Sequence, residues 1–411
     1  MNTNFKRKAF VLTGFIIISV QGFGEVIVDW NLITVRATKK AGMNSNLSSR
    51  IEAIEAIAVY DAVNAIDHIG TPYHFSSSSA ATASEVAAVA RAAHDILVHY
   101  FPDQRPSLDS LLQKSLTDIT DSGLEKAGEY IGTAAAASII ELRKNDGADP
   151  DISYPGPANP GSGQYRLTPA AFKPGIDQQW GRVKPFLLLT DSQYRPVPPP
   201  GPTRSEFKTA LAQVKEIGSI TSTSRTDEQT HIAQFYKQDA ELTVNEAARV
   251  LAINHHTSTA ENALIFVLTD IAEADARIAI WDAKYTYLFW RPVTALNANP
   301  AGTVTNNYTA WTPLVSTPPH PSYPCGHCGT VTAGFEVLKT FFGDSNTIEL
   351  HTTTAGEPPR IIHSLGEGEG ENEWSRVYGG IHYIFDNIAS DHLGREVALW
   401  TLKKGPQRKT N

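Results

Sequence analysis

The chain has 411 residues, of which 41% are hydrophobic, and a formal net charge of −8. This length allows one large domain or two smaller ones with a sizeable core. The composition excludes a disordered or collagen-like chain, and the acidic balance disfavours a nucleic-acid-binding protein.

The first 24 residues are predicted to be an export signal. Three basic residues at positions 6–8 precede an apolar run at 9–20, and Gly22 or Gly24 offers a small residue for cleavage. The alternative is a membrane anchor, but the run is shorter than the roughly 20 residues that a spanning helix needs. We therefore expect cleavage, a mature charge of −8 − 3 = −11, and an exported protein, periplasmic or extracellular, without a membrane span.

Beyond the signal, apolar residues recur with helical spacing along most of the chain. Ser49 to Glu52 form a capping box before a helix that stops near Gly70, and Thr82 to Glu85 open a second helix. Further helices are predicted at residues 108–119, 124–145, 205–217, 226–239, 243–254, 260–290, 329–342 and 379–403. There is no internal repeat, hairpin series or alternating βαβ pattern, so we predict an all-α fold of bundled helices.

Between Asp146 and Thr203 the chain is dense in proline and glycine and shows no clear helical pattern. A segment of this length is either a linker between domains or a loop that covers a site. We favour a covering segment. It divides the mature chain into an N-terminal helical region at residues 25–203 and a C-terminal helical region at 204–411.

Two cations, Lys284 and Arg291, lie seven residues apart in an aromatic stretch that ends at Pro292. Seven residues make about two helical turns, so both side chains are predicted to leave the same helix face. Burying such cations is costly unless an anion or water meets them. Taken alone, the pair is better explained as a solvated lysine and a salt-bridged arginine.

The stretch from His320 to Gly329 is rich in turn residues and leads into a helix. Free backbone N–H groups at a helix start attract anions, and Gly326 lets the backbone approach a ligand closely. Histidine side chains ordinarily titrate near neutral pH, so His327 is a candidate acid–base group. Taken alone, a capped turn with a structural histidine explains this stretch better.

A third group lies near the C-terminus. His382 and Asp386 are four residues apart, so they are predicted to face each other on a helix, where the carboxylate would orient the imidazole or support an arginine. Arg376 is off that face and is predicted to lie in the turn around Gly379 and Gly380. A single histidine on a helix is more often structural than functional.

In this order, the three groups resemble the signature of the vanadium haloperoxidase and type 2 phosphatidic acid phosphatase superfamily. That signature is Lys-x6-Arg-Pro, then Pro-Ser-Gly-His, then Ser-Arg-x3-Gly-x-His-x3-Asp. The first and third motifs match at every specified position, whereas Cys325 stands where the family has serine. The N-terminal helices and the proline-rich segment also resemble soluble haloperoxidase-type members, so the resemblance covers most of the mature chain.

The resemblance implies roles for these residues. His382 would be the axial ligand of vanadate, or the nucleophile that becomes phosphohistidine in a phosphatase. His327 would be the acid–base group, and Asp386 and His320 would support the site from behind. The oxyanion-binding groups would be Lys284, Arg291, Cys325, Gly326 and Arg376.

The implied activity is oxidation of halide by hydrogen peroxide with vanadate as cofactor, and an organic acceptor as a further small-molecule substrate. Lys284 would polarise the bound peroxide. His320 lies five residues before Cys325, as in bromide-oxidising members, which favours bromide or iodide as substrate.

Several alternatives stay open. Soluble acid phosphatases of the superfamily share the whole site, with phosphate in the place of vanadate and a phosphate ester as substrate. The exchange to Cys325 would suit an anion-binding protein without activity. Cys325 and Cys328 have the spacing of a thiol–disulfide oxidoreductase, but no βαβ context surrounds them, and with His327 they lack a fourth metal ligand. They could also pair with each other. The sequence does not indicate an oligomeric state.

Overall fold

The computed structural model describes residues 25–77, 82–298, 308 and 310–409. The predicted export signal lies outside these residues. Within them the chain is built from helices, with one small pair of strands, so the all-α prediction is confirmed. In the described part of the chain, no helix is both long and apolar enough to cross a membrane.

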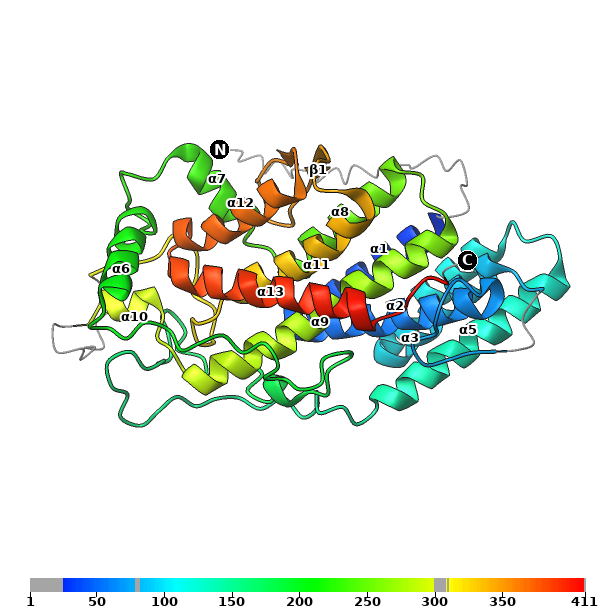
Figure 1. Ribbon diagram of the computed structural model, residues 1–411, viewed down its shortest axis with the longest axis horizontal. Coiled ribbons are helices and arrows are strands. Elements are labelled where there is room, and N and C mark those ends of the chain that lie inside the picture. The colour runs from blue at the N-terminus through cyan, green and yellow to red at the C-terminus, as the bar shows by residue number, and fades with distance from the viewer. Residues whose placement is uncertain (1–24, 78–81, 299–307, 309, 410–411) are drawn as a thin grey trace, which may run out of the picture.

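The N-terminal helices pack together at one end of the molecule (Figure 1). The helix predicted after the capping box at Ser49 begins earlier, because Asn44 caps it by accepting from the N–H groups of Asn46 and Leu47. The second helix begins after Ser84, as predicted. The elements of this region are α1 (Glu25–Lys40), α2 (Ser45–Asp67), α3 (Glu85–Tyr100), η1 (Pro102–Gln104), α4 (Arg105–Leu116) and α5 (Ser122–Arg143).

The C-terminal elements form the rest of the bundle. The helix predicted at residues 205–217 has the predicted ends, and the others are present with shifted ends. The pattern analysis missed two α-helices of this region, α10 and α12, and the antiparallel strands β1 and β2. The elements are η2 (Trp180–Arg182), α6 (Ser205–Ile217), α7 (Asp227–Phe235), α8 (Ala240–Asn254), α9 (Thr259–Tyr287), α10 (Pro292–Leu296), α11 (Gly326–Phe342), β1 (Ile348–Leu350), β2 (Arg360–Ile362), α12 (Leu365–Tyr378) and α13 (Ile384–Lys404).

Helix α9 is the central element, and it packs against α2, α11 and α13 (Figure 1). It begins with a capping box between Ser258 and Glu261 and continues without a break. It ends at Tyr287 rather than at Trp290, because Leu288 adopts a left-handed conformation (φ 46°). The C-terminal ends of α9 and α12 and the N-terminal ends of α11 and α13 therefore lie in the same half of the molecule.

Helices α11 and α13 approach each other closely through glycine. A Cβ atom on Gly394 would lie 2.5 Å from the carbonyl oxygen of Gly329, and one on Gly329 would lie 2.6 Å from Ser390 Oγ. This close contact holds the start of α11 against α13, because Ser390 Oγ also accepts from Gly329 N–H at 3.1 Å.

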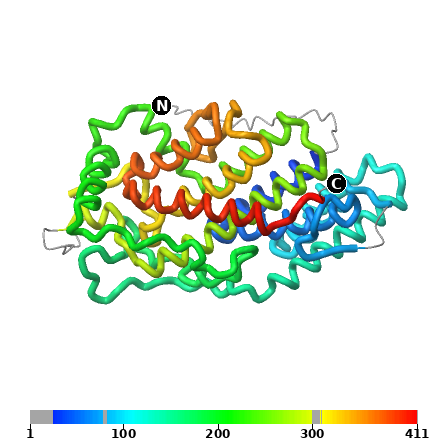
Figure 2. The backbone as a smooth tube through the Cα atoms, viewed as in Figure 1, coloured from blue at the N-terminus to red at the C-terminus, as the bar shows by residue number. Residues whose placement is uncertain are grey.

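The segment at residues 146–203 runs along one long side of the molecule, at the lower edge of the view in Figure 2. It bonds to the loops that carry the first two motifs: Tyr165 N–H donates to Leu288 O at 2.6 Å, and Ile176 N–H donates to Pro319 O at 2.9 Å. Tyr323 Oη donates to Val197 O at 2.6 Å. The segment is thus hydrogen-bonded to the loops beside the site described below, and its role as a cover stays a prediction.

Candidate active site

Lys284 lies in the last turn of α9 and is fully buried. Its ammonium group donates to the carbonyl oxygens of Pro321 at 2.8 Å, of Ser322 at 3.0 Å and of Pro324. Burial, and after it the charge of Arg291, lowers the pKa of Lys284 well below its ordinary value. The first motif is therefore tied to the loop of the second through a buried amine that can release a proton.

Arg291 caps α10 and joins all three motifs. It lies beyond the end of α9, so the expectation that it shares a helix face with Lys284 is wrong. Its Nε donates to His320 O at 2.9 Å, and its Nη2 lies 3.0 Å from His320 Nδ1. Its Nη1 donates to Ile381 O at 2.7 Å and lies 3.0 Å from His382 Nε2. Burial lowers the pKa of Arg291 to about 10.

Arg376 lies in the last turn of α12, so the prediction that it lies in the turn around Gly379 and Gly380 is wrong. The turn at Gly379 and Gly380 follows the helix, and only Gly380 takes a positive φ, of 76°. The guanidinium donates to Ser375 Oγ at 2.9 Å and to Tyr236 O. Burial lowers the pKa of Arg376.

His382 and Asp386 are in contact, as predicted, but not on one continuous helix. His382 lies in the loop before α13, and Asp386 lies in the first turn, where its carboxylate also accepts from Tyr383 N–H at 3.2 Å. This hydrogen bond caps the N-terminus of α13, so the helix begins after His382 and the histidine lies in the preceding loop. His382 Nδ1 lies 2.9 Å from Asp386 Oδ2, and burial raises the pKa of Asp386 to about 6.

These contacts assign the protonation of His382. The carboxylate accepts a hydrogen bond from Nδ1–H, so Nε2 keeps its lone pair and accepts a hydrogen bond from Arg291. Ser322 Oγ donates to the same carboxylate oxygen at 2.5 Å, and this holds the carboxylate in place. Burial and then the charges of Arg291 and Lys284 lower the pKa of His382 well below its ordinary value, which keeps the ring neutral.

The second motif forms the N-terminus of α11. Cys325 is the N-cap residue, and Gly326 provides the first backbone N–H of the helix, which has no acceptor inside the helix. His327 Nε2 lies 2.9 Å from Gln238 O and therefore donates to it, which leaves Nδ1 with a lone pair. Burial and then the charge of Arg376 lower the pKa of His327 well below its ordinary value. The two cysteines are free thiols and are buried.

The site carries an excess of buried positive charge. Among the described residues, Lys284, Arg291 and Arg376 form no salt bridge with a carboxylate, whereas the buried Arg143 and Arg277 do. A buried cation without a counter-ion is costly, so the three cations together favour a bound anion. The structure brings every residue of the predicted site into this one region.

Two residues of the site were missed by the sequence analysis. Ser322 supports the His382–Asp386 pair, as described above. Trp281 is buried, its ring lies 5.0 Å from that of His320, and its indole N–H has no partner in the described structure. Its position three residues before Lys284 on one helix face was the signal that could have identified it.

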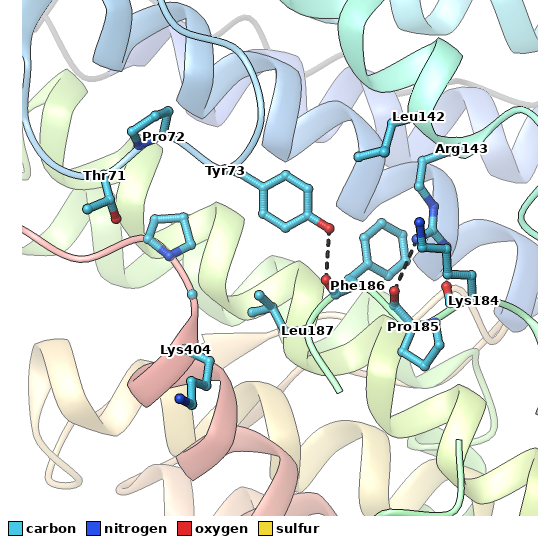
Figure 3. A pocket seen from close by; sticks show the side chains of 12 residues that line it. Thr71, Pro72, Tyr73, Leu142, Arg143, Lys184, Pro185, Phe186, Leu187 and Lys404 are labelled. Carbon is cyan, nitrogen blue, oxygen red and sulfur yellow. Dashed lines mark hydrogen bonds between the residues drawn. The ribbon is translucent and has the colours of Figure 1, made fainter. Parts of the chain in front are cut away.

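A surface cavity of about 290 Å³ lies apart from the three motifs (Figure 3). There Tyr73 Oη donates to Phe186 O at 2.9 Å, and Arg143 Nη1 donates to Pro185 O at 3.3 Å. Asp146 pairs with Arg143 at 2.8 Å, so the buried cation of this cavity is already neutralised. Lys184 and Lys404 also line this cavity, but no residue of the three motifs does.

Comparisons with known proteins agree with the motifs. Residues 264–408 match the family model described as VCPO second helical-bundle domain. The chain is 25% identical over 288 residues to vanadium chloroperoxidase from Curvularia inaequalis, and this match covers 53% of the chain and 46% of that protein. The chain thus spans about half the length of this relative.

Solved structures with the same fold include two bacterial enzymes. The crystal structure of a bacterial vanadium-dependent iodoperoxidase superposes with a TM-score of 0.82 and 23% identity, covering 96% of this chain and 99% of that one. That of a holo-type bacterial vanadium-dependent chloroperoxidase superposes with a TM-score of 0.70 and 17% identity, covering 87% and 91%. At these identities the likeness establishes the fold, and the fold is the one that the motifs implied.

Proposed function

We propose that this chain is a vanadate-dependent haloperoxidase, and the support is its three motifs, its match to the VCPO second helical-bundle domain and its fold. It would oxidise halide with hydrogen peroxide. The observation that carries the proposal is a group of three buried cations without carboxylate partners, gathered beside the lone pair of His382.

The residues present fit a tetrahedral oxyanion. Arg291 and Arg376 present planar guanidinium groups, which suit paired oxygens, and the free N–H of Gly326 adds a backbone donor. The unpartnered indole N–H of Trp281 is a further donor in this region. Vanadate bound there, with His382 Nε2 as its nitrogen ligand, would supply the Lewis-acid centre that activates hydrogen peroxide.

The chain's own groups hold and move protons around that centre. Asp386 keeps the Nδ1 proton of His382 in place, so that Nε2 stays unprotonated. His327 is neutral and keeps a lone pair on Nδ1, which suits it to accept a proton. The lowered pKa of Lys284 makes its ammonium group a better proton donor than an ordinary lysine side chain. The burial of all three cations excludes water and strengthens their field.

We favour bromide or iodide as the halide. His320 is buried and contacts both Arg291, at 3.0 Å, and the ring of Trp281. The preference rests on this histidine, whose place five residues before Cys325 resembles that in bromide-oxidising members. We also retain export as a proposal, since it rests on the sequence of residues 1–24 alone.

A soluble phosphatase is the second candidate. The fixed tautomer of His382 supports it, because a neutral imidazole with an unprotonated Nε2 is also the form that attacks phosphorus. Vanadate and phosphate share shape and charge, so the same cations would bind either. The thiol–disulfide oxidoreductase has no such support, since the fold around the cysteines is that of the haloperoxidases.

One protein sample distinguishes the two candidates. We would measure bromide and iodide oxidation with hydrogen peroxide, with and without added orthovanadate, and hydrolysis of a chromogenic phosphate ester without vanadate. Vanadate-dependent halide oxidation supports the haloperoxidase, and hydrolysis alone supports the phosphatase. His382→Ala should abolish either activity, whereas His392→Ala, an exposed histidine on the neighbouring helix α13, should leave it unchanged.

A further inference from the structure

The two cysteines of the chain meet at the start of α11, inside the proposed anion site. Cys325 is the N-cap residue of the helix, and Cys328 lies one turn later. The thiol of Cys328 donates to Cys325 Sγ at a sulfur–sulfur distance of 2.8 Å, and Cys328 N–H points to the same sulfur at 3.4 Å. Both side chains are buried, and both are free.

We propose that Cys325 and Cys328 are a reversible thiol–disulfide modification site, which hydrogen peroxide closes and which thereby weakens oxyanion binding in the same pocket. The proposal rests on the proposed function in one respect only, namely that peroxide enters this pocket. It differs from the oxidoreductase alternative, because the disulfide forms within the chain and no protein substrate is involved.

The surroundings give the two sulfurs different roles. Burial acts to raise the pKa of Cys325, but the hydrogen bonds from Cys328 and then the charge of Lys284 outweigh it, so the pKa of Cys325 lies below its ordinary value. Burial and then the Cys325 sulfur raise the pKa of Cys328 well above its ordinary value. Cys325 is therefore the sulfur that attacks, and Cys328 is the one that resolves.

The chemistry balances with peroxide as the only oxidant. The sulfur of Cys325 attacks one oxygen of hydrogen peroxide, the O–O bond breaks, and a sulfenic acid and one water form. The sulfur of Cys328 then attacks the sulfenic sulfur, the S–S bond forms, and the oxygen leaves as a second water. Two thiols lose two hydrogen atoms, and one peroxide becomes two waters.

The consequence for the anion site follows from the position of Cys325. Cys325 lies at the N-terminus of α11 beside the charges of Lys284 and Arg376, where a thiol can donate a hydrogen bond to a bound oxyanion, more weakly than a serine hydroxyl would. In the disulfide this proton is gone, and the sulfur offers no donor. We expect phosphate, used as a probe, to bind about three- to fivefold more weakly, which corresponds to the loss of one hydrogen bond of ordinary strength or less.

The first measurement counts thiols. Vanadate-free protein, reduced and desalted, is treated with an equimolar amount of hydrogen peroxide, unfolded, alkylated and weighed as the intact chain. The wild type should lose both alkylation sites and two hydrogen atoms, and dithiothreitol should restore both sites. Two sites that remain alkylatable, or a sulfur oxidised beyond recovery by dithiothreitol, would overturn the proposal.

The second measurement is phosphate binding by calorimetry, before and after peroxide. The phosphate affinity of the wild type should fall after peroxide and recover with dithiothreitol. The variant Cys325→Ser keeps a hydrogen-bond donor and cannot form the disulfide, so its phosphate affinity should not change with peroxide. Equal affinities of the oxidised and reduced wild type would overturn the link to the anion site. Neither measurement needs vanadate or halide, so a protein that closes the disulfide but oxidises no halide would refute the proposed function and leave this inference standing.

Discussion

Replacing Asp386 by asparagine tests the electrostatics of the site in one step. The carboxylate is fully buried, its Oδ2 accepts from His382, Ser322 and Tyr383 N–H, and its Oδ1 has no partner in the described structure. Asparagine keeps the shape but removes the charge that fixes the His382 tautomer. We expect halide oxidation to fall by about 10- to 100-fold, the usual effect of removing such a partner.

The same substitution has a stability effect whose sign depends on pH. Burial raises the pKa of Asp386 from 3.8 to about 6, so the folded protein favours the protonated carboxyl. The stabilisation from this proton is fully present below pH 3.8 and is lost as pH rises through about 6. At pH 8 the ionised group therefore destabilises the fold by up to about 3 kcal/mol.

Asparagine removes that cost but adds an amide donor without an acceptor, which costs about 1–3 kcal/mol. The variant Asp386→Asn should therefore be as stable as the wild type at pH 8 or up to about 2 kcal/mol more stable. The wild-type carboxyl takes up its proton as the pH falls, which stabilises the wild type but not the variant. The unfolding free energy of the variant relative to the wild type should therefore be about 1.4 kcal/mol lower at pH 5 than at pH 8. Urea unfolding at the two pH values measures both quantities. A stability difference that does not change with pH, or a loss above about 3 kcal/mol at pH 8, would refute this reasoning.

Four further variants test other parts of the structure. Ser322→Ala removes the donor to the carboxylate that orients His382, and steady-state kinetics of halide oxidation should show a fall of about tenfold with little change in the thermal midpoint. Cys325→Ser provides a stronger donor, so calorimetry should show severalfold tighter phosphate binding and halide oxidation should rise. Gly394→Ala places a Cβ 2.5 Å from Gly329 O, and urea unfolding should show a loss of about 1–3 kcal/mol. Burial raises the pKa of Asp270 to about 7, so Asp270→Asn should reduce the fall in unfolding free energy that the wild type shows between pH 6 and 8.

Each of these has a contradicting result. Unchanged kinetics in the serine variant would mean that the carboxylate needs no second donor. Weaker phosphate binding in the Cys325→Ser variant would show that the thiol has a role of its own. Unchanged stability of the Gly394→Ala variant would mean that α11 and α13 can move apart without cost. If the unfolding free energy of the Asp270→Asn variant depends on pH as that of the wild type does, the Asp270 carboxyl does not titrate between pH 6 and 8.

The helical class and the composition of the site could be predicted from the sequence, because short patterns of neighbouring residues indicate both. Apolar residues with helical spacing mark each long helix, and the three motifs name the residues that meet. The ends of helices were less predictable. Leu288 ends α9 three residues early through a left-handed conformation that nothing in its side chain requires.

Contacts between distant segments could not be predicted at all. Arg291 joins His320 and His382 through hydrogen bonds across 29 and 91 residues, and spacing within one helix gave the wrong neighbour for it. Ser322 carries no motif of its own and becomes a site residue only because the loop of the second motif lies against the start of α13. The helix α12 was missed because glycine and glutamate dominate its sequence and leave little apolar spacing.

The central claim is that the three motifs form one oxyanion site, and calorimetric titration with orthovanadate tests it most directly. We predict one saturable site for each chain, competed by phosphate and absent from His382→Ala. Binding that does not saturate, or that persists unchanged in the His382→Ala variant, would contradict the account.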